Sequence, residues 1–249
     1  AGSAALLSRA NGTPIRTIAV ANRPEWAALV RAPGSDVDDV AALAGSVAAA
    51  TRGTDPYFFL VQALREFDVP RERVEILNLQ HADGRTALFG GSVQAWSGLD
   101  PIMADAQRDG AELFYRNLAF NTFDVLNATQ RFLDERPEVA QTVVDVYQQA
   151  RAWVLASDAN LAETARILAE EAGLDAAVAR TVLAERTNLD VSPVPGADFT
   201  TALNGVGPIM AEYGDARSLD AVQQAIEEIV EPAFAQRAAA RPTPAGGNA

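Results

Sequence analysis

The chain has 249 residues, of which 49% are apolar, and a formal net charge of −13 at neutral pH. It has no Cys, no Lys and a single His, His81, so thiolate metal sites, cysteine nucleophiles and lysine chemistry are excluded and a Ser-His-Asp triad is disfavoured. The strongly acidic balance argues against a nucleic-acid partner, and neither a metal nor a cofactor is expected.

Short apolar segments alternate with helical patterns from residue 17 to residue 127. Strands are expected at 18–20, 26–30, 47–50, 74–79 and 93–97. Helices are expected between Ser35 and Gly45, from Leu60 to Phe67, at 85–89 after a cap at Asp83, and at 102–108. Such alternation is typical of an α/β fold with a parallel sheet covered by helices.

The chain becomes mostly helical from about residue 129. Val139, Val143, Val146, Ala150 and Trp153 mark one face of a long helix that follows Pro137. Further helices are expected at 161–172, 176–186, 199–213 and 219–230, with a Pro-rich connector at 188–196. Residues 237–249 are rich in Ala, Pro and Gly and are expected to form a disordered tail. No apolar run is long enough to predict a membrane span.

Two expected helices begin in the same way. Gly53-Thr54-Asp55-Pro56 and Gly98-Leu99-Asp100-Pro101 each follow a strand, with Asp placed to cap the helix and Pro placed at its first position. Gly2-Ser3 is a third possible start. Ligands of open α/β sheets bind at the carboxyl ends of the strands, where helix N-termini favour an oxyanion. A capping carboxylate repels a bare anion, so a zwitterionic or neutral polar solute suits these starts better, while ordinary capping is the alternative explanation.

Aromatic residues accompany these helix starts. Tyr57 and Trp96 are candidates for the walls of a pocket, and core packing is an equal alternative for Trp96. His81 lies between a strand end and the expected cap at Asp83, so we interpret it as a partly exposed polar residue rather than a catalyst.

Several motifs together resemble a known family. They are Gly53-Thr54-Asp55-Pro56-Tyr57, His81 to Leu88 (HADGRTAL), Gly91 to Trp96 (GSVQAW), Leu99-Asp100-Pro101, Asn188 to Gly196 (NLDVSPVPG) and Glu231 to Ala235 (EPAFA). The chain resembles the substrate-binding proteins of ABC importers for aliphatic sulfonates, nitrate and taurine, and the block from Gly91 to Pro101 is the most specific part. The sequence departs from the family where a common His is Tyr57 and a second Trp is Leu99.

The resemblance implies a two-lobed periplasmic-binding-protein fold of type II, with the N-terminal part of the first lobe missing. Residues 1–26 and 122–236 would form the first lobe and residues 27–121 the second, with crossings at 26–31 and 120–127. Together with the helix starts, it implies a ligand site made of Gly2, Ser3, Thr54, Asp55, Tyr57, Trp96, Gly98 and Asp100.

The function implied is that of a periplasmic or otherwise extracytoplasmic solute receptor without catalytic residues. It would act as a monomer, capture a small sulfonate-like or zwitterionic solute, and deliver it to an ABC permease and its ATPase subunits at the membrane. A leader outside this sequence could supply a lipid anchor. The alternative is an enzyme on the same fold, such as a hydrolase resembling sulfinate desulfinases, although those enzymes use a Cys that this chain lacks. A membrane-associated sensor domain is a third possibility.

Overall fold

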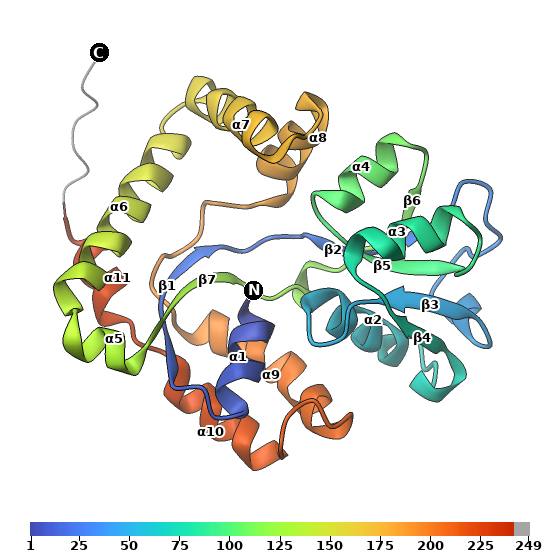
Figure 1. Ribbon diagram of the computed structural model, residues 1–249, viewed down its shortest axis with the longest axis horizontal. Coiled ribbons are helices and arrows are strands. Elements are labelled where there is room, and N and C mark those ends of the chain that lie inside the picture. The colour runs from blue at the N-terminus through green and yellow to red at the C-terminus, as the bar shows by residue number, and fades with distance from the viewer. Residues whose placement is uncertain (242–249) are drawn as a thin grey trace.

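The computed structural model describes residues 1–241 (Figure 1). The strands are β1 (Ile15–Asn22), β2 (Ala27–Arg31), β3 (Val47–Ala50), β4 (Glu75–Asn78), β5 (Ala95–Leu99), β6 (Glu112–Tyr115) and β7 (Asp124–Thr129). The helices are α1 (Gly2–Ala10), α2 (Asp55–Glu66), α3 (His81–Phe89), α4 (Ile102–Arg108), α5 (Gln130–Glu135), α6 (Pro137–Leu155), α7 (Asp158–Ala172), α8 (Ala176–Arg180), α9 (Ala197–Glu212), α10 (Leu219–Ile229) and α11 (Ala233–Ala239). A π-helical segment, Thr181–Arg186, continues α8, and short 3-10 turns lie at Ala41–Leu43, Arg71–Arg73 and Leu118–Phe120.

The larger sheet has five strands in the order β4-β3-β5-β2-β6. Strand β3 runs parallel to both β4 and β5, whereas β2 runs antiparallel to both β5 and β6. The expectation of a parallel sheet is therefore wrong for β2, which runs antiparallel to the strands on both of its sides. The parallel relation of β3 and β5 is confirmed, and both helix starts that follow them lie at the same edge of the sheet.

Helices cover both faces of this sheet. Helix α2 contacts β2, β3 and β5, and its apolar side chains share one buried cluster with Leu29, Ala48 and Ala50. On the opposite face, α3 and α4 contact β5 and enclose a second cluster that contains Val30 and Trp96. This alternation along the strands reflects the two-residue period of side chains in a sheet.

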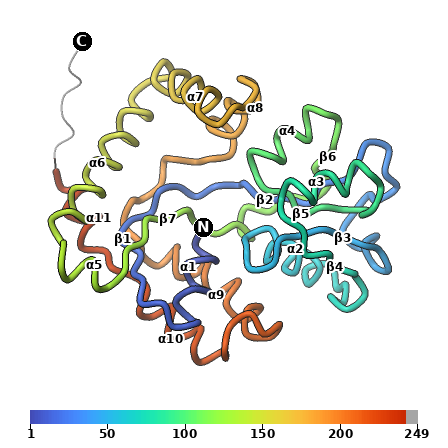
Figure 2. Tube along the Cα trace, in the orientation of Figure 1, coloured from blue at the N-terminus to red at the C-terminus, as the bar shows by residue number. Residues whose placement is uncertain are grey.

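The remaining elements surround an antiparallel pair, β1 and β7. One side of β1 packs through Ile18 and Ala19 against α5, α6 and α11. Helices α1 and α10 contact β1, and α9 packs against both of these helices (Figure 2). Helix α11 includes Arg237–Ala239, so a disordered tail from residue 237 is wrong for these three residues, since Ala238 is buried in the cluster around β1. Residues 242–249 of the expected tail lie outside the described residues.

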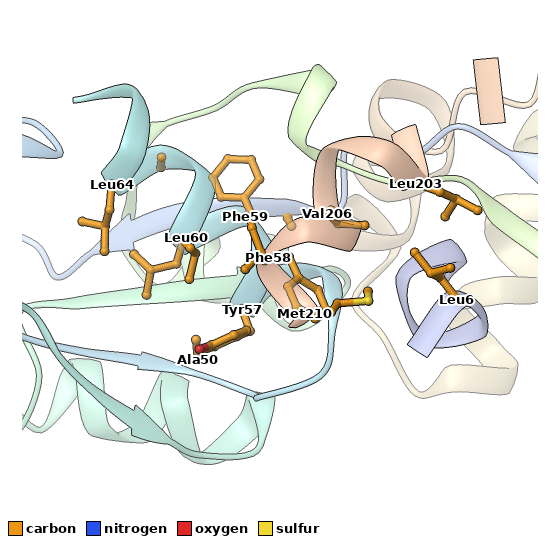
Figure 3. Close-up of a cluster of buried hydrophobic side chains, with 14 of the residues drawn as sticks. Leu6, Ala50, Tyr57, Phe58, Phe59, Leu60, Leu64, Leu203, Val206 and Met210 are labelled. Atoms are coloured by element: carbon orange, nitrogen blue, oxygen red, sulfur yellow. The ribbon is translucent and has the colours of Figure 1, made fainter. Parts of the chain in front are cut away.

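The main buried cluster joins the two groups of elements. Figure 3 shows Leu6 of α1, Leu203 and Val206 of α9, and Phe58 and Phe59 of α2 in one cluster. The five-stranded sheet comes entirely from within residues 27–121, and β1 and β7 flank it in sequence. Residues 27–121, called the middle segment below, are the proposed second lobe.

Candidate functional site

The first predicted helix start forms a buried hydrogen-bonded group instead of a cap. Asp55 is the first residue of α2, and its carboxylate accepts hydrogen bonds from the Ser3 hydroxyl and, at 2.7 Å, from the Thr122 hydroxyl. Thr54, which precedes α2, donates its hydroxyl proton to the carbonyl of Thr51 at 2.6 Å. The capping prediction for Asp55 is therefore wrong, because its side chain turns toward α1 and the segment before β7.

The N–H groups of the α1 start are also occupied. The Gly2 N–H donates to the Phe123 carbonyl at 2.7 Å, and the Ser3 N–H donates to the Thr122 hydroxyl at 3.2 Å. A Cβ on residue 2 would lie 3.0 Å from the ring of Phe199, so glycine permits this close approach. Gly2 and Ser3 consequently hold α1 in place, and these two N–H groups do not serve as free donors.

The cap of the second helix start lies one residue later than predicted, because Pro101 is the N-cap residue of α4 and Asp100 precedes it. The Asp100 carboxylate still accepts a hydrogen bond from the Ala104 N–H in α4 at 2.9 Å. Its oxygens also lie 3.1 Å from Nη1 of Arg186. Burial raises the pKa of the Asp100 carboxyl, while the neighbouring Arg186 guanidinium acts to lower it. A role in ligand contact stays a prediction for Asp100, whose carboxylate is held by partners of this chain.

The aromatic candidates lie in the core. Tyr57 belongs to the main cluster, with its ring edge against Phe58. Trp96 is 1% exposed, and α3 approaches its indole so closely that a Cβ on Gly84 would lie 2.7 Å away. Gly98 lets β5 pass Val30 and Met103, which would lie 2.9 and 3.0 Å from an added Cβ. The placement of Tyr57 and Trp96 in a pocket wall is wrong for the cavity described next, because packing encloses both rings.

A cavity of about 220 Å³ opens beside the Asp55 group. It lies where the starts of α1 and α2 meet the entry to β2, the end of β5 and the start of β7. The residues that line it are Ala1, Ala4, Pro24, Trp26, Ala27, Thr54, Asp55, Pro56, His81, Leu99, Asn121 and Asp124. Of the predicted site residues, it therefore brings together Thr54 and Asp55, while Ser3 supports Asp55 from α1.

The polar groups at this cavity include several hydrogen-bond acceptors. Burial raises the pKa of the Asp55 carboxyl and lowers that of the His81 imidazole. Nδ1 of His81 lies 3.2 Å from the hydroxyl of Thr51, which already donates to the Leu79 carbonyl at 2.7 Å. Since a hydroxyl has one proton, Nδ1 must be the donor, which leaves Nε2 of a neutral His81 as an acceptor.

Asn121, at the end of the middle segment, holds the first residue of β2. Its side-chain oxygen accepts from the Ala27 N–H at 2.8 Å, and its amide nitrogen donates to the carbonyls of Ala27 and Asn117. Trp26, Asn121 and Asp124 were missed as site residues, although the sequence placed all three in the expected crossings. The sequence signal for these three residues was their position between the expected lobes. For His81, the signal was its position directly after an expected strand.

The described residues contain no group of His, Asp or Glu side chains suited to hold a metal ion. Among the same residues, no helix is long and apolar enough to cross a bilayer.

Comparisons with solved structures identify the fold. The chain is similar to the periplasmic aliphatic sulphonate binding protein SsuA from Escherichia coli, with a TM-score of 0.77 and 22% identity over 91% of this chain and 72% of that one. The alkanesulfonate-binding protein SsuA from Xanthomonas axonopodis pv. citri, bound to MOPS, gives a TM-score of 0.69 and 20% identity over 94% and 76%. The desulfurization enzyme DSZB gives 0.71 and 15% identity over 95% and 83%.

These similarities confirm the α/β periplasmic-binding-protein fold, which both binding proteins and an enzyme share. A search of characterised proteins by sequence finds no match. A family model described as NMT1/THI5 like matches residues 1–160, which is more than half of the chain. The chain therefore belongs to the NMT1/THI5-like family.

Proposed function

We propose that the protein is the extracytoplasmic solute-binding component of an ABC importer. One observation carries the proposal: the cavity of about 220 Å³ lies where both crossing segments meet the start of α2. A solute held there touches both proposed lobes, so binding favours their closed arrangement. The receptor would then deliver the solute to a membrane permease and its ATPase subunits.

The chemistry of the cavity favours a zwitterionic solute with an ammonium group. Asp55, Asp124 and neutral His81 supply acceptors, and Arg is absent from the lining residues. The anionic end of the same solute would point away from the start of α2, because Asp55 is the first residue of that helix. The support for a sulfonate as that anionic end comes from the SsuA structures, one of which is bound to MOPS.

Isothermal titration tests this proposal with taurine, alkanesulfonates of increasing length, MOPS, nitrate and precursor pyrimidines of thiamine. Ala4→Phe should abolish binding, because Ala4 is an exposed residue that lines the cavity and the added ring would fill it. Ala150→Phe is the matched control, since it adds the same ring at an exposed position of α6. A wild-type protein that binds no solute of the panel, or equal binding by both variants, would contradict the proposal.

The enzyme alternative is favoured by one observation, the structural similarity to DSZB, of which a cysteine-to-serine mutant was also solved in complex with biphenyl-2-sulfinic acid. The present sequence contains no Cys that could play a nucleophile's part. Incubation with biphenyl-2-sulfinic acid and measurement of released sulfite decide between the two. We expect no release of sulfite. Turnover of the sulfinate would show that the protein is an enzyme and would contradict the receptor proposal.

A further inference from the structure

A buried ion pair joins the late helical region to the middle segment. The side chains of Arg186 and Asp100 are only 6% and 0% exposed, and Nη1 of Arg186 lies 3.1 Å from both carboxylate oxygens. Nη2 of Arg186 donates to the side-chain oxygen of Gln107 in α4. One guanidinium thus contacts both the end of β5 and the helix that follows it.

The same segment also holds the entry to β2. The Arg186 carbonyl accepts from the Glu25 N–H at 2.8 Å, and the Thr187 hydroxyl accepts from the Trp26 indole N–H at 3.3 Å. Asp100 completes the arrangement, because its N–H donates to the Trp26 carbonyl at 2.9 Å. Hydrogen bonds therefore connect Arg186 and Thr187 to Glu25 and Trp26, and they connect Asp100 to both Trp26 and Arg186.

Apolar packing supports these polar contacts. Val178 of α8 and Val182 of the π-helical segment form a small buried cluster with Ala104 of α4, and Trp26 packs against it. Both charged side chains are themselves buried, so the energetic cost of leaving one of the charges without its partner is large.

We propose that Arg186 is a positioning residue for the solute site, which from outside the cavity fixes the position of the Trp26 side chain beside Leu99. Both of these residues line the cavity, whereas Arg186 does not. The indole is held through Thr187 and the neighbouring Glu25, and Leu99 is held through its neighbour Asp100. The inference rests on the proposed function, since it assigns a role toward the solute that the cavity would bind.

Two variants separate this role from general stability. Arg186→Met leaves the Asp100 carboxylate buried without a countercharge, which is strongly destabilising. In the double variant D100N/R186M both charges are removed, while the Asn oxygen still accepts from the Ala104 N–H. Replacing both partners of a buried pair costs much less than removing one, so the double variant keeps the protein folded for measurement.

Fluorine NMR of protein labelled with 5-fluorotryptophan gives three signals, for Trp26, Trp96 and Trp153, assigned with single Trp→Phe variants. In D100N/R186M, and in R186M where it folds, we expect the Trp26 signal alone to move and to gain a solvent isotope shift. Trp96 lies in a separate cluster and Trp153 is exposed on α6, so both should keep their positions. Arg186→Lys, which preserves the charge, should restore part of the wild-type Trp26 shift.

An unchanged Trp26 signal would overturn the role of Arg186, and so would equal movement of all three signals, which would indicate a general structural effect. These outcomes do not depend on any solute. A wild-type protein that binds nothing in the titration panel refutes the proposed receptor, whereas the fluorine signals alone decide whether Arg186 fixes Trp26.

Discussion

Single residues at the site owe their roles to partners distant in sequence. Asp55 was interpreted from its neighbours as a helix cap, but its hydroxyl partners Ser3 and Thr122 lie 52 and 67 positions away. No local pattern reveals such contacts, because they depend on how α1 and the start of β7 are brought to α2. The bond from the Ala104 N–H to the Asp100 carboxylate was within reach of the sequence, since it spans only four residues, although the N-cap of the helix lies one residue later than predicted.

The Asp55 group predicts a pH dependence of stability. Burial holds the pKa of the Asp55 carboxyl above its ordinary value near 4, so the folded state binds this proton more tightly than the unfolded state. The corresponding contribution to stability is full below the unfolded pKa and is lost as the pH rises through the raised, folded pKa. Asp55→Asn removes this contribution.

Urea unfolding of the wild type and of Asp55→Asn between about pH 3 and pH 7 measures this contribution, because the Asp side chain titrates and the Asn side chain does not. The free energy of unfolding of the wild type minus that of the variant should fall as the pH rises from about 4. A difference that stays constant over this range would contradict the assignment.

At the scale of elements, the sequence predicted β3 and α4 with their observed bounds and most of the late helices to within a few residues. These segments have strong local signals, namely an apolar run or a helical period with Gly and Pro at the ends. Strand β6 was not predicted, because it is short and its pairing with β2 is a tertiary contact. The antiparallel direction of β2 is likewise set by partners that the local sequence does not identify.

Helix α6 presents its apolar side chains differently from a typical amphipathic helix. Val139, Val143, Val146 and Trp153, which the sequence places on one face, are all exposed. The side chains that are buried belong to Ala140, Val144, Asp145 and Arg151. Periodicity therefore predicted the helix correctly, but the face that packs against β1 and α11 is another one.

Two neighbouring valines test this orientation. Val144→Ala should lower the free energy of unfolding by about 2 kcal/mol, because Val144 is fully buried and its loss leaves a cavity. Val143→Ala removes the same atoms from a side chain that is 50% exposed and should cost less than about 0.5 kcal/mol. Urea denaturation compares them, and equal losses would show that the face of Val143 is buried in solution.

At the scale of the whole molecule, the main buried cluster runs through both groups of elements. Phe58 of α2 and Leu203 of α9 belong to it although they lie on opposite sides of the proposed lobe division. The resemblance predicted two lobes, and sequence alone could not show this shared core, which depends on the approach of α9 to α2.

This shared core predicts a single cooperative unfolding transition. Leu203→Ala should shift the denaturation midpoint equally for both groups of elements, because the cavity it creates lies in their common cluster. Circular dichroism and the separate fluorine signals of Trp96 and Trp153 should follow the same transition. Two resolved transitions, of which the variant moves only one, would contradict a common core.

The sheet order has a consequence for the order of folding. Strand β2 lies between β5 and β6, and both of these partners come much later in the chain. During synthesis from the N-terminus, β2 therefore emerges well before any strand with which it pairs. Its backbone N–H and carbonyl groups have no strand partner until residues 95–115 have been synthesised. Contacts so distant in sequence must overcome loop-closure entropy first, so completion of this sheet should be a slow step relative to helix formation.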